Sequence, residues 1–262
     1  MSEFYVGYLQ KPPEGILRFL KKLVPALALL LLAVAVVLLS GQGPFANSAF
    51  EFGTIRTFEG VIVARPYPTL HVARPGQVGV EGEYSEYLLV APGKHGADEL
   101  VASSDGQTVR LAGQLIYRDG STMVEIVPGS LQRVSGPSFA GPEIQELGSI
   151  TITGEIVDSK CFLGVMNPGN GKVHRDCAAR CLSGGLPPLL VSADGRKQYL
   201  LLGPDRKPLV RDALREFIAE PISTTGELLQ RGKTLMLVID PQALRHAPDR
   251  LQDLLGSAGP ER

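Results

Sequence analysis

Residues Thr151–Val157 read TITGEIV, and residues Thr57–Ile62 read TFEGVI. Each stretch places β-branched or aromatic residues around one glycine, which is typical of a strand that bends sharply. Small closed barrels need such bends to turn their corners. The two stretches therefore predict the opening strands of two small and similar β-structures.

Further signals follow each opening strand in the same order. Each copy has a Tyr-Leu-Leu strand, a second glycine-containing strand, a glycine turn, and an apolar strand that a proline stops. These lie at residues 86–90, 108–117, 119–120 and 123–128 in the first copy, and at residues 198–201, 222–229, 231–232 and 235–241 in the second. Several short, bent strands indicate an OB-like barrel. The sequence therefore predicts a mainly β protein with two tandem OB-like barrels, although unrelated strands share some of these signals.

The second copy carries an insertion between its opening strand and its Tyr-Leu-Leu strand, and the insertion holds Cys161, Cys177 and Cys181. Residues 173–182 can form a short helix, with Gly184 as a left-handed cap and prolines beyond it. On that helix His174, Cys177 and Cys181 follow one another at helical spacing and share one face. Cys161 lies at the end of the opening strand, from which its loop can fold over that face.

One imidazole and three thiolates form the ligand set of a tetrahedral zinc site. The sequence therefore predicts a metal site of Cys161, His174, Cys177 and Cys181, with zinc as the favoured ion. Copper(I) is the alternative, because it also prefers soft thiolates. Asp158 directly follows a strand, where it either accepts the His174 N–H and orients the ring or is a simple turn residue. Arg175 is expected to lie near the thiols. The Cys-x12-His-x2-Cys-x3-Cys spacing is not that of a standard zinc finger.

A disulfide is the competing interpretation of the cysteines. In an oxidising compartment Cys161 can pair with Cys177 or Cys181, whereas Cys177 and Cys181 are too far apart on a regular helix to pair with each other. One thiol then remains, with His174 and Arg175 beside it to lower its pKa. That thiol can serve a redox or metal-loading function, or the disulfide can simply stabilise the barrel. The sequence leaves these alternatives open.

The same residues carry a resemblance to a family of exported or membrane-anchored bacterial proteins without an assigned activity. The family's core is G-E-[IV]-V-D-x-x-C, H-x-x-C-A-x-x-C and G-x-P, followed by D-G and a Y-L-L strand. The matching positions here are Gly154–Asp158, Cys161, His174, Cys177-Ala178, Cys181, Gly185, Pro187, Asp194-Gly195 and Tyr199–Leu201. The resemblance covers residues 150–240 only. It implies that the cysteines and His174 act as one unit, and it implies no particular ligand.

Residues Leu23–Leu39 read LVPALALLLLAVAVVLL, without a charged residue. At about 1.5 Å per residue this run nearly spans a hydrocarbon core of roughly 30 Å, and it predicts a transmembrane helix with Pro25 in its first turn. Lys and Arg lie upstream of the run and are missing downstream until Arg56. This asymmetry predicts a cytoplasmic N-terminus and a periplasmic or extracytoplasmic C-terminal region. A cleaved signal peptide is the alternative, and it exports the same region.

The expected layout has six parts. They are a cytoplasmic N-terminal segment (1–22), the transmembrane helix (23–40), the first OB-like domain (50–133), a linker (134–148), the second OB-like domain (149–245) and a C-terminal tail (246–262). The remaining histidines are expected away from the site, with His71 and His95 solvated in loops and His246 in a short terminal helix. Tyr67 is expected in a stiff, proline-rich loop that either connects strands or offers a docking surface.

Composition limits the function. The formal net charge is −1, so no nucleic-acid partner is indicated. No arrangement of residues in the sequence indicates a catalytic nucleophile with its base and orienting group, so a non-enzymatic function is favoured. The leading hypothesis is a single-pass inner-membrane accessory protein with a zinc site, acting as a subunit or assembly partner of a membrane or redox complex. Its expected partners are the membrane, through residues 23–40, and another protein.

Overall fold

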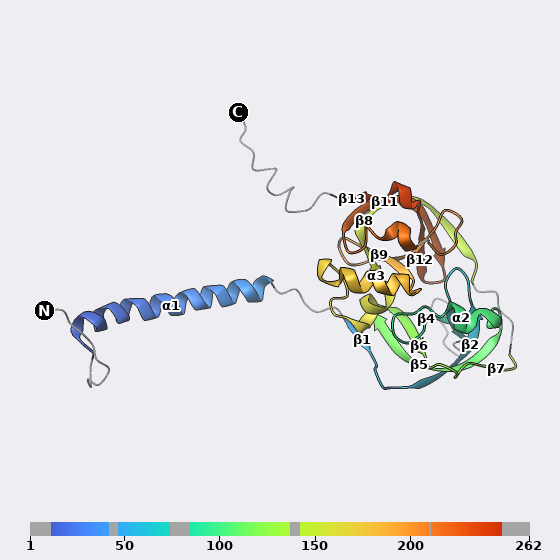
Figure 1. Ribbon diagram of the computed structural model, residues 1–262, viewed down its shortest axis with the longest axis horizontal. Coiled ribbons are helices and arrows are strands. Elements are labelled where there is room, and N and C mark those ends of the chain that lie inside the picture. Colours follow the sequence, from blue (N-terminus) through green and yellow to red (C-terminus); the bar gives the residue numbers. More distant parts are fainter. Residues whose placement is uncertain (1–11, 42–46, 74–83, 137–141, 210, 248–262) are drawn as a thin grey trace, which may run out of the picture. The chain divides into compact units, whose positions relative to one another are not determined.

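The structure is a computed structural model that describes residues 12–41, 47–73, 84–136, 142–209 and 211–247. The chain divides into two compact units, Met1–Phe45 and Ala46–Arg262, and each is described by itself (Figure 1). The first unit contains helix α1. The second contains the strands of both barrels and the cysteines.

Helix α1 spans Glu14–Gly41 and is 28 residues long. At about 1.5 Å per residue it exceeds the roughly 30 Å of a hydrocarbon core. The helix is therefore long and apolar enough to span a membrane. A signal sequence near an N-terminus meets the same two criteria. It begins before Leu23 because residues 14–22 include several good helix formers. Pro25 consequently lies inside the helix, and the expectation that it occupies the first turn is wrong.

Barrel 1 closes in the order β2-β3-β4-β6-β5, with β5 pairing again with β2. Among the described residues its strands are β2 (Arg56–Val63), β3 (Thr69–Ala73), β4 (Tyr84–Val90), β5 (Thr108–Arg118) and β6 (Ser121–Ile126). Strands β1 (Ser48–Phe50) and β7 (Gln132–Arg133) pair with β5, and helix α2 (Asp98–Val101) connects β4 towards β5. The β4–β6 pair is parallel, and the other pairs in the barrel are antiparallel.

Barrel 2 closes in the equivalent order, β8-β9-β10-β12-β11, with β11 pairing again with β8. Its described strands are β8 (Ile144–Asp158), β9 (Pro188–Ser192), β10 (Gln198–Leu202), β11 (Pro221–Arg231) and β12 (Thr234–Val238). Helix α3 (Arg175–Ser183) lies between β8 and β9 in the chain, and strand β13 (Arg245–His246) pairs with β11. The β10–β12 pair is parallel, like β4–β6 in barrel 1.

The prediction of a mainly β chain with two barrels is confirmed. In both barrels the first strand pairs with the second and fourth, and the third runs parallel to the fifth. This arrangement is compatible with an OB-like barrel. Figure 1 shows the two barrels next to each other within the second unit.

Glycines allow the strands of both barrels to pack closely at equivalent positions. A Cβ atom on Gly60 of β2 would meet the backbone of His71 on β3, and one on Gly154 of β8 would meet the backbone of Val191 on β9. Gly113 and Gly226, on the fourth strands, similarly face residues of β6 and β12. The glycines that predict bent strands are therefore positions where a side chain would collide with the next strand.

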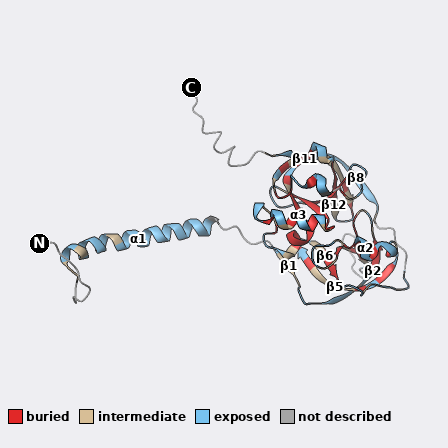
Figure 2. Ribbon diagram, viewed as in Figure 1, coloured by how far each residue is buried: buried red, intermediate tan, exposed pale blue. Residues whose placement is uncertain are grey.

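One apolar core joins the two barrels. Tyr67, Ile116 and Met123 of barrel 1 pack in a single cluster with buried residues of barrel 2, including Leu163, Leu200 and Met236. Each barrel also has a core of its own, and Figure 2 shows buried residues concentrated inside both. The Tyr67 hydroxyl donates a hydrogen bond to the Leu201 carbonyl across the boundary, at 2.9 Å. Tyr67 lies in the loop that connects β2 and β3, as expected, but it is a buried anchor between the barrels, so the alternative of an exposed docking surface is wrong.

The sequence misses the second strand of each barrel. β3 contains His71, which is almost fully buried, so the expectation of a solvated loop histidine is wrong. β9 begins at Pro188, directly after the prolines that indicate a helix end. Both strands are short and lie beside Gly- or Pro-rich segments, which hide a strand of five residues. His95 is exposed in a turn, as expected.

Two boundaries also differ from the sequence-based expectation. β8 begins at Ile144, within the expected linker 134–148, because a β-bulge at Gly148 lets the strand continue where the sequence indicates a break. His246 forms strand β13 with Arg245 instead of a terminal helix, and pairs with Ile222 of β11. Residues 137–141 of the linker and 248–262 of the tail lie outside the described residues.

Candidate metal centre

The end of β8 positions the first residues of the site. Asp158 is the last residue of β8, and Cys161 opens a helical turn at Cys161–Val165. The Cys161 backbone N–H donates a 2.8 Å hydrogen bond to Asp158 Oδ1. Asp158 is fully buried and Cys161 nearly so. The strand end therefore fixes both a carboxylate and a thiol in the interior.

Helix α3 supplies the other two thiols from one of its faces. Cys177 and Cys181 are four residues apart in the helix, a spacing that places their side chains above one another. Cys161 Sγ lies 3.9 Å from Cys177 Sγ and 3.9 Å from Cys181 Sγ. The three sulfur atoms lie within 4.8 Å of one another. Cys161 and Cys181 are buried, and Cys177 is partly exposed.

His174 lies beside Asp158. Its Nε2 is 2.9 Å from Asp158 Oδ2, and its side chain is almost fully buried. The donor atoms of Asp158, Cys161 and His174 lie within 4.8 Å of one another, which makes a second group that shares Cys161 with the three thiols. The structure thus brings together the cysteines, and it places His174 with Asp158 and Cys161.

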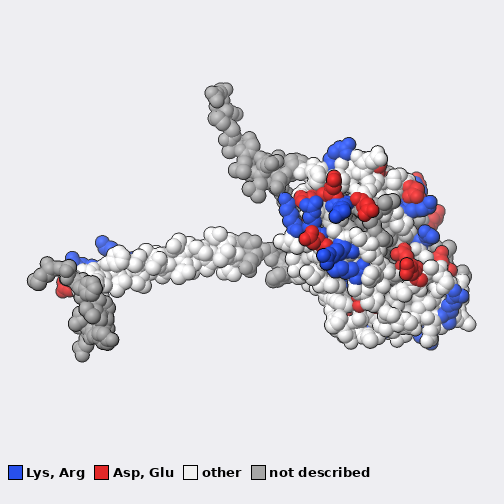
Figure 3. Space-filling model, in the orientation of Figure 1, with Lys and Arg blue, Asp and Glu red and all other residues white. Residues whose placement is uncertain are grey.

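A lysine from barrel 1 covers the thiols. Lys94 Nζ is 2.8 Å from Cys177 Sγ and 3.5 Å from Cys181 Sγ. Lys94 lies in the loop between β4 and α2, so it reaches the cluster from the other barrel. No spacing in the sequence links Lys94 to the cysteines, and sequence reasoning missed it. Basic side chains gather on the face that carries α3 (Figure 3).

Close contacts hold the Lys94 loop in place. The Lys160 ammonium contacts Glu125 of β6 and donates hydrogen bonds to the carbonyls of Ala91 and Gly93, at 2.9 and 2.6 Å. The Gly96 N–H donates to the Gly184 carbonyl at 3.0 Å. A Cβ atom on Gly184 would collide with the Lys94 carbonyl. Lys160 and the glycines therefore let barrel 1 approach α3 closely enough for Lys94 to reach the sulfurs.

Gly184 is needed for this contact, and its backbone is not left-handed. Its φ is −77°, so the expectation of a left-handed cap at this position is wrong. The positive φ belongs to Gly185, at +107°. The sequence places the end of the helix correctly within one residue. Gly184 itself is needed for another reason, the close approach of the Lys94 loop of barrel 1.

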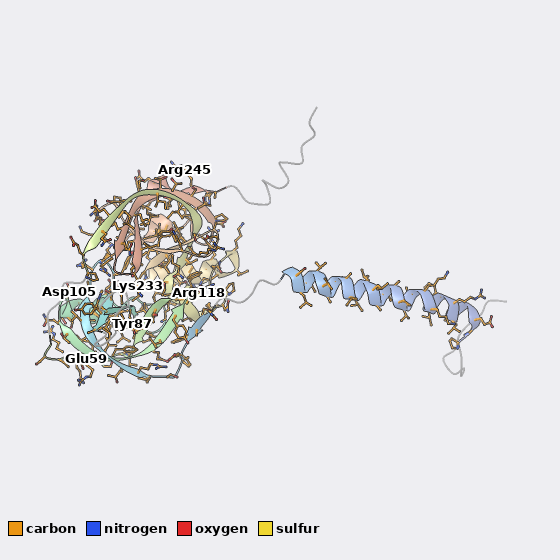
Figure 4. The ribbon with its side chains drawn as sticks, turned by 180° about the vertical axis from the view of Figure 1, so that it is seen from behind. Glu59, Tyr87, Asp105, Arg118, Lys233 and Arg245 are labelled. Carbon is orange, nitrogen blue, oxygen red and sulfur yellow. The ribbon has the colours of Figure 1, made fainter. Side chains whose placement is uncertain are left out.

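The loop between Cys161 and His174 is braced on both sides. Arg118 of β5 donates hydrogen bonds to the carbonyls of Phe162 and Pro168, at 2.8 and 2.9 Å, and its guanidinium lies 4.0 Å from the centre of the Phe162 ring. Arg118 lies where the two barrels meet (Figure 4). Glu155 accepts a 2.5 Å hydrogen bond from the Gly171 N–H. Arg175 forms an ion pair with the partly buried Glu220, at 3.1 Å, and so points to a different partner than the thiols near which it was expected.

The surroundings give the thiols different acidities. The hydrogen bond from Cys161 and, to a lesser degree, the Lys94 ammonium together lower the pKa of Cys181 to about 7, against the opposing effects of burial and the charge of Asp158. The hydrogen bond to Cys181, burial and the charge of Asp158 raise the pKa of Cys161. The hydrogen bond to Cys177 raises the pKa of Lys94, so the lysine remains charged. A metal ion bound in the centre of the cluster would replace the protons of these thiols.

The spacing of the sulfurs fits a single metal ion. Zn–S bonds of about 2.3 Å at tetrahedral angles place two sulfurs about 3.8 Å apart. Cys161 lies 3.9 Å from each of the other sulfurs. A disulfide requires about 2.05 Å, so all three cysteines are free thiols in this structure. The donor set is soft and suits zinc or copper(I).

A cavity between the barrels lies apart from this cluster. It has a volume of about 560 Å³ between the barrels, and residues such as Tyr87, Gln198 and Lys233 line it. Tyr87 and Lys233 are labelled in Figure 4, on facing sides of the boundary. None of the three cysteines lines the cavity. The cysteine cluster and this cavity are therefore separate features.

Comparison with known proteins adds no name for this site. No protein-family model matches the chain. No curated protein and no solved structure is significantly similar to it. The function is therefore argued from the residues of the cluster.

Proposed function

We propose that barrel 2 is a thiolate metal-binding module, with zinc as the favoured ion and copper(I) as the alternative. The observation that carries this proposal is the triangle of Cys161, Cys177 and Cys181, in which Cys161 lies 3.9 Å from each of the other two sulfurs. Three thiolates leave one position of a tetrahedral ion for a further ligand. The sequence predicts His174 as that ligand. The 2.9 Å contact of His174 with Asp158 instead supports a pairing of these two residues.

The module belongs, in this proposal, to a single-pass protein of the inner membrane. Helix α1 is the anchor, and the basic residues before it support a cytoplasmic N-terminus with both barrels in the periplasm. The shared topology supports an OB-like assignment for the barrels. The resemblance of residues 150–240 to exported or membrane-anchored bacterial proteins supports the same location. Its function is that of a subunit or assembly partner in a membrane or redox complex, because the described site offers ligands for a metal ion and no recognised catalytic set.

The test uses the full chain, purified in detergent without oxygen. Bound metal is measured by elemental analysis, and free thiols are counted under denaturing conditions after a chelator has removed the metal. We expect at least one ion per chain and three thiols. Chain without metal and with a single thiol would contradict the proposal. Replacing Cys177 by Ser should reduce the bound metal, whereas replacing the neighbouring exposed Ser183 by Ala should not.

The second candidate is a thiol-redox or metal-loading function. Cys177 is the partly exposed thiol, and the Lys94 ammonium lies 2.8 Å from its sulfur. Rapid alkylation of Cys177 near neutral pH in metal-free protein that binds no zinc would favour this candidate. A disulfide between Cys161 and either helix cysteine would instead favour a structural role, and mass spectrometry of the unreduced chain detects it.

A further inference from the structure

Asp158 and His174 form a donor pair that the three-thiolate site does not use. His174 Nε2 lies 2.9 Å from Asp158 Oδ2. Asp158 is fully buried, and only 4% of the His174 side chain is exposed. A buried carboxylate beside a buried imidazole is costly unless each polar atom has a partner. Both carboxylate oxygens of Asp158 have a partner, the Cys161 N–H and His174 Nε2. A shared proton, or a cation in its place, can therefore hold the pair.

A metal ion can replace the proton of this pair after a small shift of the side chains. Two donors bound at about 2.0–2.1 Å and at the tetrahedral angle lie about 3.3 Å apart, a few tenths of an ångström more than the contact between His174 and Asp158. The Cys161 N–H holds the other carboxylate oxygen at 2.8 Å and so fixes the orientation of Asp158. Cys161 Sγ is a third donor atom, and it lies within 4.8 Å of the donor atoms of Asp158 and His174. A hydrogen bond between these two residues needs no third donor. The third donor makes this a ligand set.

Cys161 is the residue that the two donor sets share. A thiolate sulfur has enough lone pairs to bind two cations at once. In known two-metal sites the ions lie about 3.5–4 Å apart, a separation that a single bridging atom can span. Cys161 is buried, at 4% exposure, and lies at the meeting point of β8 and the inserted loop. Its position therefore suits a bridge better than the position of partly exposed Cys177.

We propose that a second divalent ion of the zinc type binds Asp158, Cys161 and His174, and that the Cys161 thiolate bridges it to the ion on the three thiolates. This inference rests on the proposed metal function. Zinc accepts sulfur, nitrogen and oxygen donors together, which is the combination present here. The second ion has three protein ligands and one position for a ligand from outside. The cluster is then a two-metal centre.

The decisive measurement is the number of zinc ions bound by the full chain in detergent. We expect two ions per chain for the natural sequence. The double variant Asp158→Asn/His174→Gln should bind one ion, because it keeps the three thiolates. The matched double variant Asp205→Asn/His246→Gln changes the same residue types at exposed positions and should still bind two.

The outcomes separate this inference from the function on which it rests. One ion in the natural chain overturns the second site and leaves the thiolate site in place, whereas no ion overturns both. If the Asp158/His174 variant fails to fold, the count in the natural chain still decides. Two ions in that variant would place the second ion elsewhere and overturn the assignment.

The bridge has its own readout, with cobalt(II) as a paramagnetic probe. Two cobalt ions joined by one thiolate couple magnetically, so the electron paramagnetic resonance signal at two equivalents should fall below twice the signal at one. An additive signal would overturn the bridge. Cys161→Ser should abolish most binding at both sites, whereas Cys177→Ser should leave the ion held by Asp158, Cys161 and His174.

Discussion

Lys94 brings a positive charge from barrel 1 to thiols that belong to barrel 2. Its ammonium lies 2.8 Å from Cys177 Sγ and 3.5 Å from Cys181 Sγ. Three thiolates around a divalent ion carry a net charge of about −1, which a neighbouring ammonium offsets. Lys94 is therefore expected to stabilise the metal-bound form without being a ligand.

Replacing Lys94 by Met should weaken zinc binding by about tenfold to a hundredfold. A hydrogen bond to a charged group contributes about 1.5–3 kcal/mol, and 1.4 kcal/mol corresponds to a tenfold change. Competition with a chelator of known affinity measures the change. Lys94→Arg should recover most of the affinity, and Lys207→Met, at an exposed loop position, should have none of the effect. Equal affinity in Lys94→Met would show that the ammonium is irrelevant to the metal.

His71 makes a separate prediction about pH. Burial and, to a lesser degree, the charge of Arg231 lower the pKa of His71 to about 4 from its ordinary 6.5. Between these values the unfolded chain binds the proton and the folded chain does not, so stability is full above pH 6.5 and falls as the pH drops towards 4. The contribution of His71 to this loss is about 3 kcal/mol.

Chemical unfolding at several pH values tests this. His71→Gln should lose stability less steeply between pH 6.5 and 4 than the natural chain does. His246→Gln, in exposed β13, should keep the natural slope. An identical slope in the His71 variant would contradict the buried, neutral state assigned to this ring.

At the scale of elements, α3 depends on a glycine for its contact with barrel 1. Gly184→Ala adds a methyl group that would collide with the Lys94 carbonyl, although the backbone angles suit alanine. Such overpacking costs about 1–3 kcal/mol. We expect the variant to unfold more easily and its Cys177 to be alkylated faster, because the Lys94 loop must move. Ser183→Ala, one residue earlier and exposed, provides the comparison, and equal behaviour of the two variants would contradict the close contact.

The elements predicted from sequence are those with a strong local pattern. β2, β4, β5 and β6, and their counterparts in barrel 2, combine apolar runs with glycine or proline signals. β3 and β9 lack such a pattern, because each borders a segment rich in glycine or proline that indicates a loop. His71 was misplaced for this reason, whereas Tyr67 lies in its expected loop and only its burial was not predicted. Their burial comes from packing between strands and barrels, which no local sequence pattern encodes.

At the scale of the whole molecule, buried charges join the barrels. Arg231 of β11 contacts Glu86 of β4 at 3.0 Å and donates a 2.7 Å hydrogen bond to the Arg65 carbonyl. Only 4% of the Arg231 side chain and 12% of the Glu86 side chain are exposed. Removing one partner of such a pair leaves the other charge buried and uncompensated.

Arg231→Met should therefore lower the free energy of unfolding by about 3–5 kcal/mol. The double variant Arg231→Met/Glu86→Gln should recover part of the loss, because neither charge is then left alone. Arg206→Met removes an exposed arginine with two acidic partners and should cost less than about 1 kcal/mol. Denaturant titration of all four proteins gives the comparison. A loss in Arg231→Met no larger than in Arg206→Met would contradict a structural role for the buried pair.

Only the part of the candidate site that lies within barrel 2 could be predicted from the sequence. The spacing of His174, Cys177 and Cys181 indicates a shared face, and the position of Asp158 at a strand end indicates a partner for His174. Lys94, Lys160 and Arg118 were not predicted, because their contacts cross from one barrel to the other or join segments far apart in the chain. The division of the donors into two sets that share Cys161 likewise depends on distances that spacing does not give.

The position of Lys94 has a consequence for how the protein is made. A growing chain folds from its N-terminus, domain by domain. All strands that close barrel 1 precede Cys161 in the chain, and so do Lys94 and Glu125. Barrel 1, with its Lys94 loop, is therefore complete before the cysteines are synthesised. If a permuted gene placed barrel 2 before barrel 1, the thiols would stay exposed until the Lys94 loop had been synthesised.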